Sequence, residues 1–260
     1  MNSPASDIKA IENELKKTVS VAGAILYHLG LADYMGHCSA RVPGTDHIVI
    51  KPRHSVSVHG MGTVEPDRMI VIDMDGKPVE GRDGPPAEIF IHTEIYRARP
   101  DIGGIVHTHQ MMTTAFGVVG RPILPILATE SPHAARPFPV YCDPDLVNSP
   151  ARGKALAEAL GDHDTVHIQN HGVVFTGPTV EEATLASIHI ERLALLNYFS
   201  LQLGTPNVIP QEKISEMLKG NRVGYPVRFA YYKSLLDTGA LSARSIVGAP
   251  PIAQHLNLTK

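Results

Sequence analysis

The sequence has few cysteines, no long apolar run and no block of basic residues. Cys38 and Cys142 are the only two cysteines, too few for a disulfide framework. No run of 18 apolar residues occurs, so we expect no membrane span. Lysine and arginine are scattered and the net charge is −3, which argues against nucleic acid or an anionic membrane as a partner. Residues 1–17 contain acids and no apolar core, so we expect no signal peptide and place the protein in the cytoplasm.

The composition of the 260 residues is that of a globular protein, with 43% hydrophobic and 19% charged residues. Apolar residues recur at helical spacing through residues 8–29, and short β-like runs follow. No linker divides the chain, so we expect one domain over residues 1–260. Its predicted class is α/β, with a central, mostly antiparallel sheet flanked by helices. Residues 205–260 are expected to form a helical extension and an arm.

The pattern predicts helices and short strands in alternation. Thr179 and Glu182 have the spacing of a capping box before a long helix. The expected helices cover residues 8–29, 87–97, 111–119, 151–160, 179–203, 211–218 and 229–236. The expected strands cover residues 37–42, 47–51, 69–73, 103–109, 138–141, 165–169 and 173–176.

A pair of histidines is the first sign of chemistry. His107 and His109 occur in GGIVHTHQ, after a short apolar run that reads as a buried strand. Residues two apart on a strand point to the same face, so both imidazoles can bind one ion. Three protein ligands with an open position make a catalytic metal site. With 14 histidines in the chain, such a pair can also arise by chance.

Five sequence segments that follow one another in a fixed order argue against a chance pair of histidines. They are GHCSAR (36–41), IVIKPR (48–53), VIDMDGKPVEG (71–81), PPAEIFIHTEIYRARPDIGGIVHTHQ (85–110) and NHGVVFTG (170–177). From about residue 10 to about residue 205 the chain resembles the class II aldolase/adducin family. The resemblance implies a single-domain, three-layer fold and one divalent ion per chain, with Zn, Mn, Co or Fe all suited to the ligands. It also implies a homotetramer or higher homo-oligomer that acts on a small molecule.

The same resemblance assigns the metal ligands. It implies that His107, His109 and His171 bind the ion, and that Glu88 is in the same site as ligand or acid/base group; we take Glu88 as a candidate for both roles. Gly172 after His171 permits an unusual backbone turn, and a carboxylate is favoured near a helix start. Alone, Glu88 would read as a helix-capping acid. His92, one turn later, reads as a packed or hydrogen-bonded histidine.

The chain departs from the family's sugar-phosphate members at the phosphate-binding segments. Where those members carry motifs resembling SGN-S-R, TPSG and SSE, this sequence has GHCSAR, KPRH and PAE. We expect His37, in place of asparagine, to be the second candidate for proton transfer. Arg53, His54 and Ser39 are expected to bind substrate, since an arginine fork suits a carboxylate. Alternatively, Arg53 pairs with a surface acid such as Glu65 or Asp67.

These motifs resemble the branch of the family that contains metal-dependent decarboxylases of hydroxylated aromatic dicarboxylates. The resemblance implies a lyase of aromatic compound degradation, acting on a carboxylate such as a dihydroxyphthalate through a metal-chelated, enediolate-like intermediate. One alternative is a metal-dependent aldolase or epimerase of a sugar phosphate or hydroxy keto acid. An alternative of another class is an adducin-like scaffold without catalysis. Glu130 and His133, in the segment after the HTH strand, are weaker candidates for the pocket.

Overall fold

The computed structural model describes residues 4–56, 58, 60–221 and 225–242. They form one eight-stranded sheet in the order β4-β3-β2-β1-β5-β8-β7-β6. Every neighbouring pair is antiparallel except β6 and β7, which are parallel. The strands are β1 His37–Arg41, β2 Ile48–Ile50, β3 Ile70–Ile72, β4 Pro78–Glu80, β5 Gly104–Thr108, β6 Val140–Tyr141, β7 Thr165–Ile168 and β8 Gly172–Gly177.

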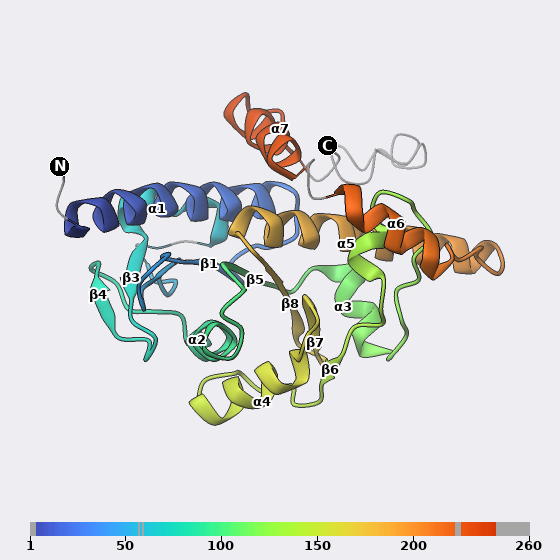
Figure 1. Ribbon diagram of the computed structural model, residues 1–260, viewed down its shortest axis with the longest axis horizontal. Helices are drawn as coiled ribbons and strands as arrows, with labels where there is room; N and C mark the ends of the chain where they lie inside the picture. The colour runs from blue at the N-terminus through green and yellow to red at the C-terminus, as the bar shows by residue number, and fades with distance from the viewer. Residues whose placement is uncertain (1–3, 57, 59, 222–224, 243–260) are drawn as a thin grey trace.

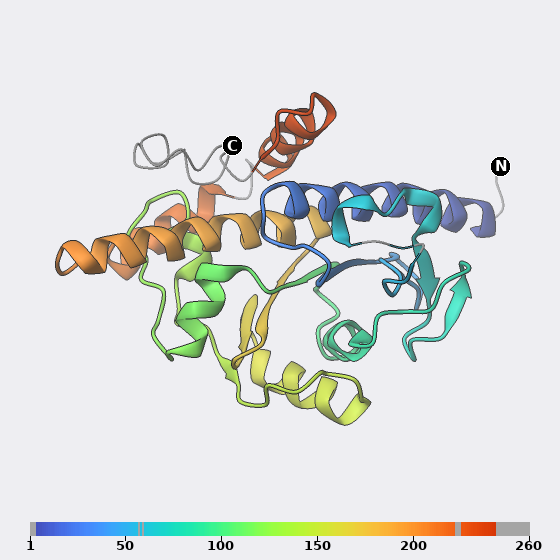
Figure 2. The same cartoon turned by 180° about the vertical axis from the view of Figure 1, so that it is seen from behind.

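Helices cover both faces of this sheet (Figure 1). Helices α1 (Pro4–His28) and α5 (Val180–Leu203) lie on one face, and α2 (Ile89–Ala98) and α4 (Pro150–Leu160) lie on the other. Helix α7 (Tyr225–Asp237) packs on the outer side of α1 and α5. Helices α3 (Met111–Val118) and α6 (Gln211–Asn221) lie beside the far part of α5. The reverse view shows the same three layers (Figure 2).

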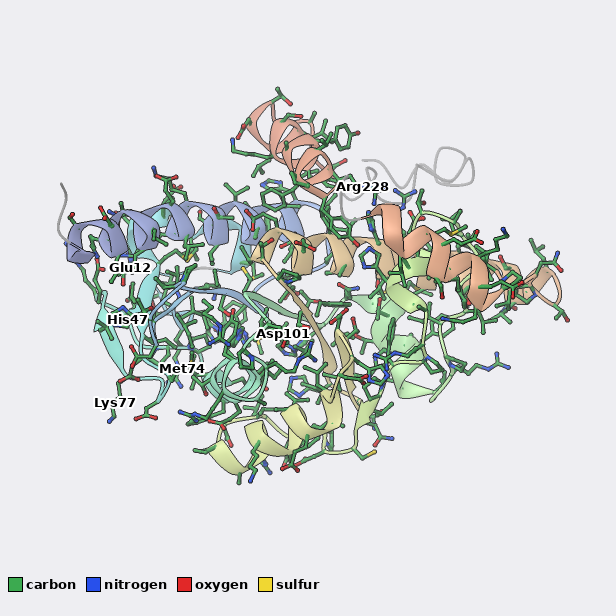
Figure 3. The ribbon with its side chains drawn as sticks, viewed as in Figure 1. Glu12, His47, Met74, Lys77, Asp101 and Arg228 are labelled. Carbon is green, nitrogen blue, oxygen red and sulfur yellow. The ribbon has the colours of Figure 1, made fainter. Side chains whose placement is uncertain are left out.

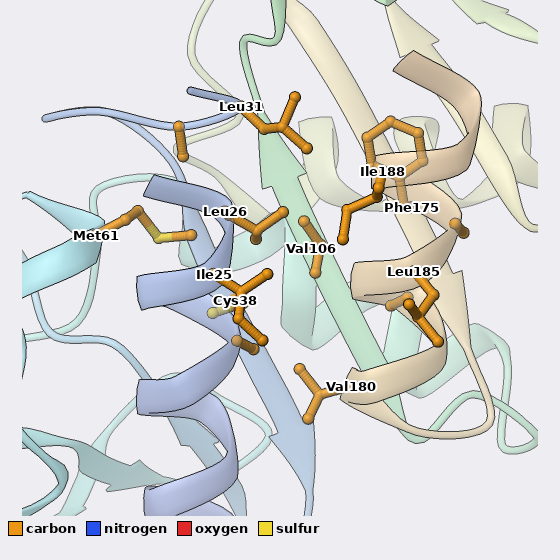
Figure 4. Close-up of a cluster of buried hydrophobic side chains, with 14 of the residues drawn as sticks. Ile25, Leu26, Leu31, Cys38, Met61, Val106, Phe175, Val180, Leu185 and Ile188 are labelled. Carbon is orange, nitrogen blue, oxygen red and sulfur yellow. The ribbon is translucent and has the colours of Figure 1, made fainter. Parts of the chain in front are cut away.

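Two apolar cores bury the two faces of the sheet. Strands β2 and β3 both read Ile-Val-Ile and are buried throughout, as expected of strands with both faces covered. Their valines belong to the core under α1 and α5, and their isoleucines to the core above α2 and α4. In the first core (Figure 4), Ile25 and Leu26 of α1 point toward Val106 of β5, with Ile188 of α5 on its other side.

Polar contacts tie α1 to the sheet and cap the start of α5. Glu12 of α1 bonds to Nδ1 of His47 at 2.8 Å, just before β2 (Figure 3). At the start of α5, the Thr179 hydroxyl accepts a hydrogen bond from the Glu182 backbone N–H at 3.2 Å. Gly104 permits the close approach of β5 to this helix start, because a Cβ there would lie 2.2 Å from the Val180 nitrogen.

The structure confirms the expected α/β class, with a mostly antiparallel sheet between helices. Its elements differ from the expected ones at their ends. Helix α2 begins at Ile89, after a turn over residues 87–88, and β5 ends at Thr108, so His109 follows the strand. Strand β4 and the 3-10 turns Met61–Thr63, Pro66–Arg68 and Ser131–Ala134 were not anticipated. No helix among the described residues is long and apolar enough to span a membrane. The arm expected at the C-terminus falls largely on residues 243–260, which lie outside the described residues.

Candidate metal centre and active site

The three histidines come together at one end of the central strands. His107 is the fourth residue of β5, His109 follows the strand, and His171 immediately precedes β8, the antiparallel neighbour of β5. The Nε2 atoms of His107 and His109 are 3.2 Å apart. Glu88 faces them from the start of α2, with Oε2 3.7 Å from Nε2 of His107 and Oε1 3.6 Å from Nε2 of His171.

These four side chains fit a single metal ion. One ligand atom from each can be chosen so that all four lie within 4.8 Å of one another. Ligands at roughly 2.1 Å around a tetrahedral ion are about 3.4 Å apart, close to the 3.2–3.7 Å separations found between neighbours here. The structure therefore groups the four predicted ligands as a divalent ion would require.

Neighbouring backbone prepares the imidazoles for this role. Nδ1 of His107 lies 3.0 Å from the Val173 carbonyl oxygen, to which an Nδ1–H donates. That bond leaves the Nε2 lone pair of His107 free to bind a metal. Gly172 provides the space, since a Cβ there would lie 2.7 Å from Cδ2 of His109 and 2.6 Å from the Thr108 carbonyl oxygen.

Glu88 occupies the N-cap position of α2 but does not cap it with its side chain. Instead, Oε1 accepts a hydrogen bond of 3.0 Å from the Val147 backbone N–H. Burial alone would raise the pKa of Glu88, but His171, His107 and the Val147 N–H outweigh it and lower the pKa to about 2. The carboxylate is therefore charged at neutral pH, as a metal ligand or a base requires.

A pocket of about 420 Å³ opens beside Glu88 and His37. It is lined by Met35, Gly36, His37, Lys51, Arg53, His54, Pro86, Ala87, Glu88 and Leu146. Arg53 is exposed, and no carboxylate of the described chain lies within ion-pair distance of it, so the alternative pairing with Glu65 or Asp67 is not seen. His37, Arg53 and His54 all line this pocket, which is therefore the candidate substrate site.

Lys51 is a pocket residue that sequence reasoning missed. Its side chain is buried, and Nζ donates to the Pro52 carbonyl oxygen at 3.1 Å. Burial lowers the pKa of Lys51, with the Cys38 thiol acting weakly in the opposite direction. The only sequence signal was a lysine at the end of a buried strand, directly before Pro-Arg.

Ser39 does not reach the pocket. It is fully buried, and its hydroxyl bonds to Nδ1 of His92 at 2.7 Å and to the Tyr96 hydroxyl at 2.9 Å. The side chain points to the same face of β1 as His37, but α2 covers it. The structure therefore does not support Ser39 as a substrate contact, whereas it does find His92 buried and hydrogen-bonded, as expected.

The weaker candidates Glu130 and His133 lie elsewhere in the described chain. Glu130 is buried and pairs with Nε of Arg192 at 3.4 Å. His133 bonds to His189 Nδ1 at 2.9 Å and lines a separate cavity of about 220 Å³. Neither residue borders the pocket beside Glu88.

Comparison with known proteins identifies the family. The profile described as "Class II Aldolase and Adducin N-terminal domain" matches residues 17–198, which include all four candidate ligands. This chain belongs to the class II aldolase and adducin family. A family relative named 3,4-dihydroxyphthalate decarboxylase, from Arthrobacter keyseri, is 32% identical over 216 residues, covering 78% of this chain and 85% of its own length.

Solved structures of class II aldolases share the fold. An L-fuculose 1-phosphate aldolase from Glaciozyma antarctica PI12 superimposes with a TM-score of 0.75 at 20% identity, over 92% of this chain and 94% of its own. An aldolase II superfamily protein from Pseudomonas syringae gives a TM-score of 0.76 at 21% identity, over 94% and 97% of the two chains. These similarities confirm the family fold.

Proposed function

We propose that this protein is a metal-dependent carbon–carbon lyase that decarboxylates a hydroxylated aromatic carboxylate of the dihydroxyphthalate type. The observation that carries the proposal is the pocket, which is lined both by Glu88 of the candidate metal cluster and by Lys51, Arg53 and His54. A pocket that combines cations with a metal ligand suits a substrate with two acidic ends.

His107, His109, His171 and Glu88 would hold the ion, which when bound supplies Lewis-acid polarisation of substrate oxygens. Arg53, with Lys51 beside it, would hold the carboxylate that stays on the ring, through charge-assisted hydrogen bonds. The bond between the ring and the departing carboxylate breaks, carbon dioxide leaves, and the electron pair remains at the ring carbon. Glu88 is positioned to take a proton from a substrate hydroxyl and return it to that carbon.

Two further observations support this choice over phosphate chemistry. The pocket walls carry charged, long side chains where a phosphate site would use serine hydroxyls and glycine backbone amides. The 32% identical relative is named for decarboxylation of a dihydroxylated phthalate.

The direct test follows carbon dioxide and aldehyde release from metal-loaded protein. We expect stoichiometric carbon dioxide and a singly carboxylated catechol from 3,4-dihydroxyphthalate, and no cleavage of fuculose 1-phosphate or ribulose 5-phosphate. Faster turnover of a phosphorylated sugar would replace the proposal with the aldolase or epimerase alternative. Absence of bound metal and of any turnover would support the adducin-like scaffold.

We further propose a homotetramer or higher homo-oligomer in the cytoplasm. Apolar side chains remain exposed on α3 and on the C-terminal half of α5, among them Met111, Tyr198, Phe199 and Leu203. Such a surface is typical of subunit contacts. Sedimentation equilibrium tests the assembly, and a monomer at micromolar concentration would contradict it.

A further inference from the structure

A chain of four buried side chains leads away from Glu88 into the protein. His37 Nε2 lies 3.9 Å from Oε2 of Glu88, and His37 Nδ1 lies 2.7 Å from Nε2 of His92. The remaining links are the bonds of Ser39 to Nδ1 of His92 and to the Tyr96 hydroxyl. His92, Ser39 and Tyr96 are each at most 1% exposed, so water does not compete for these links.

At the buried end of this series of side chains, one donor-to-acceptor direction of the hydrogen bonds is favoured. The 2.7 Å contact between the two imidazoles requires one nitrogen to donate and the other to accept. Within the described chain, Ser39 is the hydrogen-bond partner found for the Tyr96 hydroxyl. If Tyr96 only accepted from Ser39, its own proton would be buried without an acceptor, which costs about 1–3 kcal/mol. Tyr96 therefore donates to Ser39, and Ser39 donates to Nδ1 of His92.

The same reasoning assigns the ring protons of His92 and His37. With Nδ1 of His92 accepting, its proton is on Nε2 and is donated to Nδ1 of His37. Burial lowers the pKa of His92 to about 3, so its ring is neutral and has one proton to place. Because Nδ1 of His37 accepts this hydrogen bond, a proton on that ring can only be on Nε2, the atom that faces the Glu88 carboxylate. The opposite direction would turn a lone pair of His37 toward that negative charge, so both ends of the chain favour the same arrangement.

We propose that His92, Ser39 and Tyr96 are positioning residues that fix His37 as its Nε2–H tautomer, so that it donates a hydrogen bond into the pocket beside Glu88. The acceptor would be an anionic substrate oxygen, and in this respect the inference rests on the proposed function. A donor held in place before the substrate arrives needs no reorganisation when charge develops on that oxygen.

This assignment also changes the role expected for His37. Burial raises the pKa of Tyr96 well above its ordinary value, so the Tyr96 end of this series does not release protons to replace one lost from His37. His37 acts here as a neutral donor, and proton transfer to carbon is left to Glu88.

Two substitutions of His92 separate this role from mere packing. In His92→Gln, the side-chain amide retains a donor for Nδ1 of His37, whereas His92→Leu removes it at similar volume. Thr93→Val on the same helix is the matched control, because its buried hydroxyl has no hydrogen-bond partner in the described chain. Each variant is loaded with zinc and examined by nitrogen-15 NMR of the imidazoles, with the His37 signals identified by their loss in His37→Gln.

We expect wild-type His37 to carry its proton on Nε2 and to keep it there in Thr93→Val and largely in His92→Gln. In His92→Leu we expect a mixture of tautomers and a roughly 10-fold lower kcat, the size of one hydrogen bond, with zinc content unchanged. Should His92→Leu fail to fold, Ser39→Ala removes the donor to Nδ1 of His92 and is expected to mix the tautomers in the same way.

A wild-type His37 protonated on Nδ1 would overturn the inference, as would equal losses of kcat in His92→Gln and His92→Leu. The NMR measurement needs no substrate. A fixed Nε2–H tautomer in a protein that does not decarboxylate dihydroxyphthalate would therefore refute the proposed function and leave the tautomer assignment standing.

Discussion

His37 and His107 lie directly opposite each other on the antiparallel strands β1 and β5, with ring centroids 5.0 Å apart. One is a candidate metal ligand, and the other replaces the asparagine expected from the family's sugar-phosphate members. A substrate oxygen that reaches an ion at His107 therefore also passes His37. Under the proposed function, His37 would act near the reacting atoms, and Arg53 and His54 would bind the carboxylate that stays on the ring.

Removing one ligand tests the metal centre. His109→Ala is expected to lower metal content from one ion per chain to well below half, because three protein ligands remain where four were present. His109 lies beyond the end of β5, so the sheet should be retained. Metal analysis by mass spectrometry, with circular dichroism for folding, checks this. Full occupancy in the variant would remove His109 from the ligand set.

Glu88→Gln separates charge from shape. The amide retains an oxygen that can accept from the Val147 N–H, but it cannot take up a proton from the substrate. We expect turnover to fall by about 100-fold or more, the usual scale for an acid–base group, while some metal stays bound by the three histidines. Steady-state kinetics at matched metal occupancy is the measurement, and near-normal kcat would make Glu88 a bystander.

The cations of the pocket should differ in their effects. Arg53→Lys keeps the charge but loses the bidentate geometry, and because Arg53 is exposed we expect about a 10-fold rise in KM for a dicarboxylate with little change in kcat. Lys51→Met removes a buried charge beside the pocket, and we expect it to raise KM more than Arg53→Lys does. Arg82→Lys is a control outside the pocket lining. Unchanged KM in both pocket variants would place the carboxylate elsewhere.

His167 provides a pH test that is independent of the metal. Burial lowers its pKa from the ordinary 6.5 to about 4, so the unfolded state takes up a proton before the folded state does. Above about pH 6.5, His167 is neutral in both the folded and the unfolded state, so its titration does not change the free energy of unfolding. As the pH drops from there toward 4, this group lowers the free energy of unfolding by at most about 1.4 kcal/mol per pH unit. His167→Gln should flatten this fall in calorimetric unfolding from pH 7 to 4.5. Equal slopes for this variant and the wild-type protein would contradict the assignment.

Strand alternation, a local property, predicted from the residues alone that His107 and His109 lie together, whereas the place of His171 in the same site came from the family resemblance. Glu88 required the resemblance, since its position at a helix start reads equally well as a cap. The error at Ser39 has a long-range cause. Alternation correctly puts Ser39 on the face of His37, but only the docking of α2 determines that His92 and Tyr96 cover it. Lys51 was missed for a related reason, because the sequence does not show which strand ends border a cavity.

Helix α2 carries Glu88 at its N-cap and His92 and Tyr96 at successive four-residue steps, so a single helix would support both the proposed ion and the proposed donor tautomer. A shift of α2 that moves Glu88 toward the histidines would also move His92 relative to His37. We therefore expect thermodynamic coupling, in which ion loading raises the affinity for the substrate anion and the anion raises retention of the ion by the same factor. Such a helix would make the site respond as an all-or-none unit, with poorly loaded protein losing substrate recognition together with turnover.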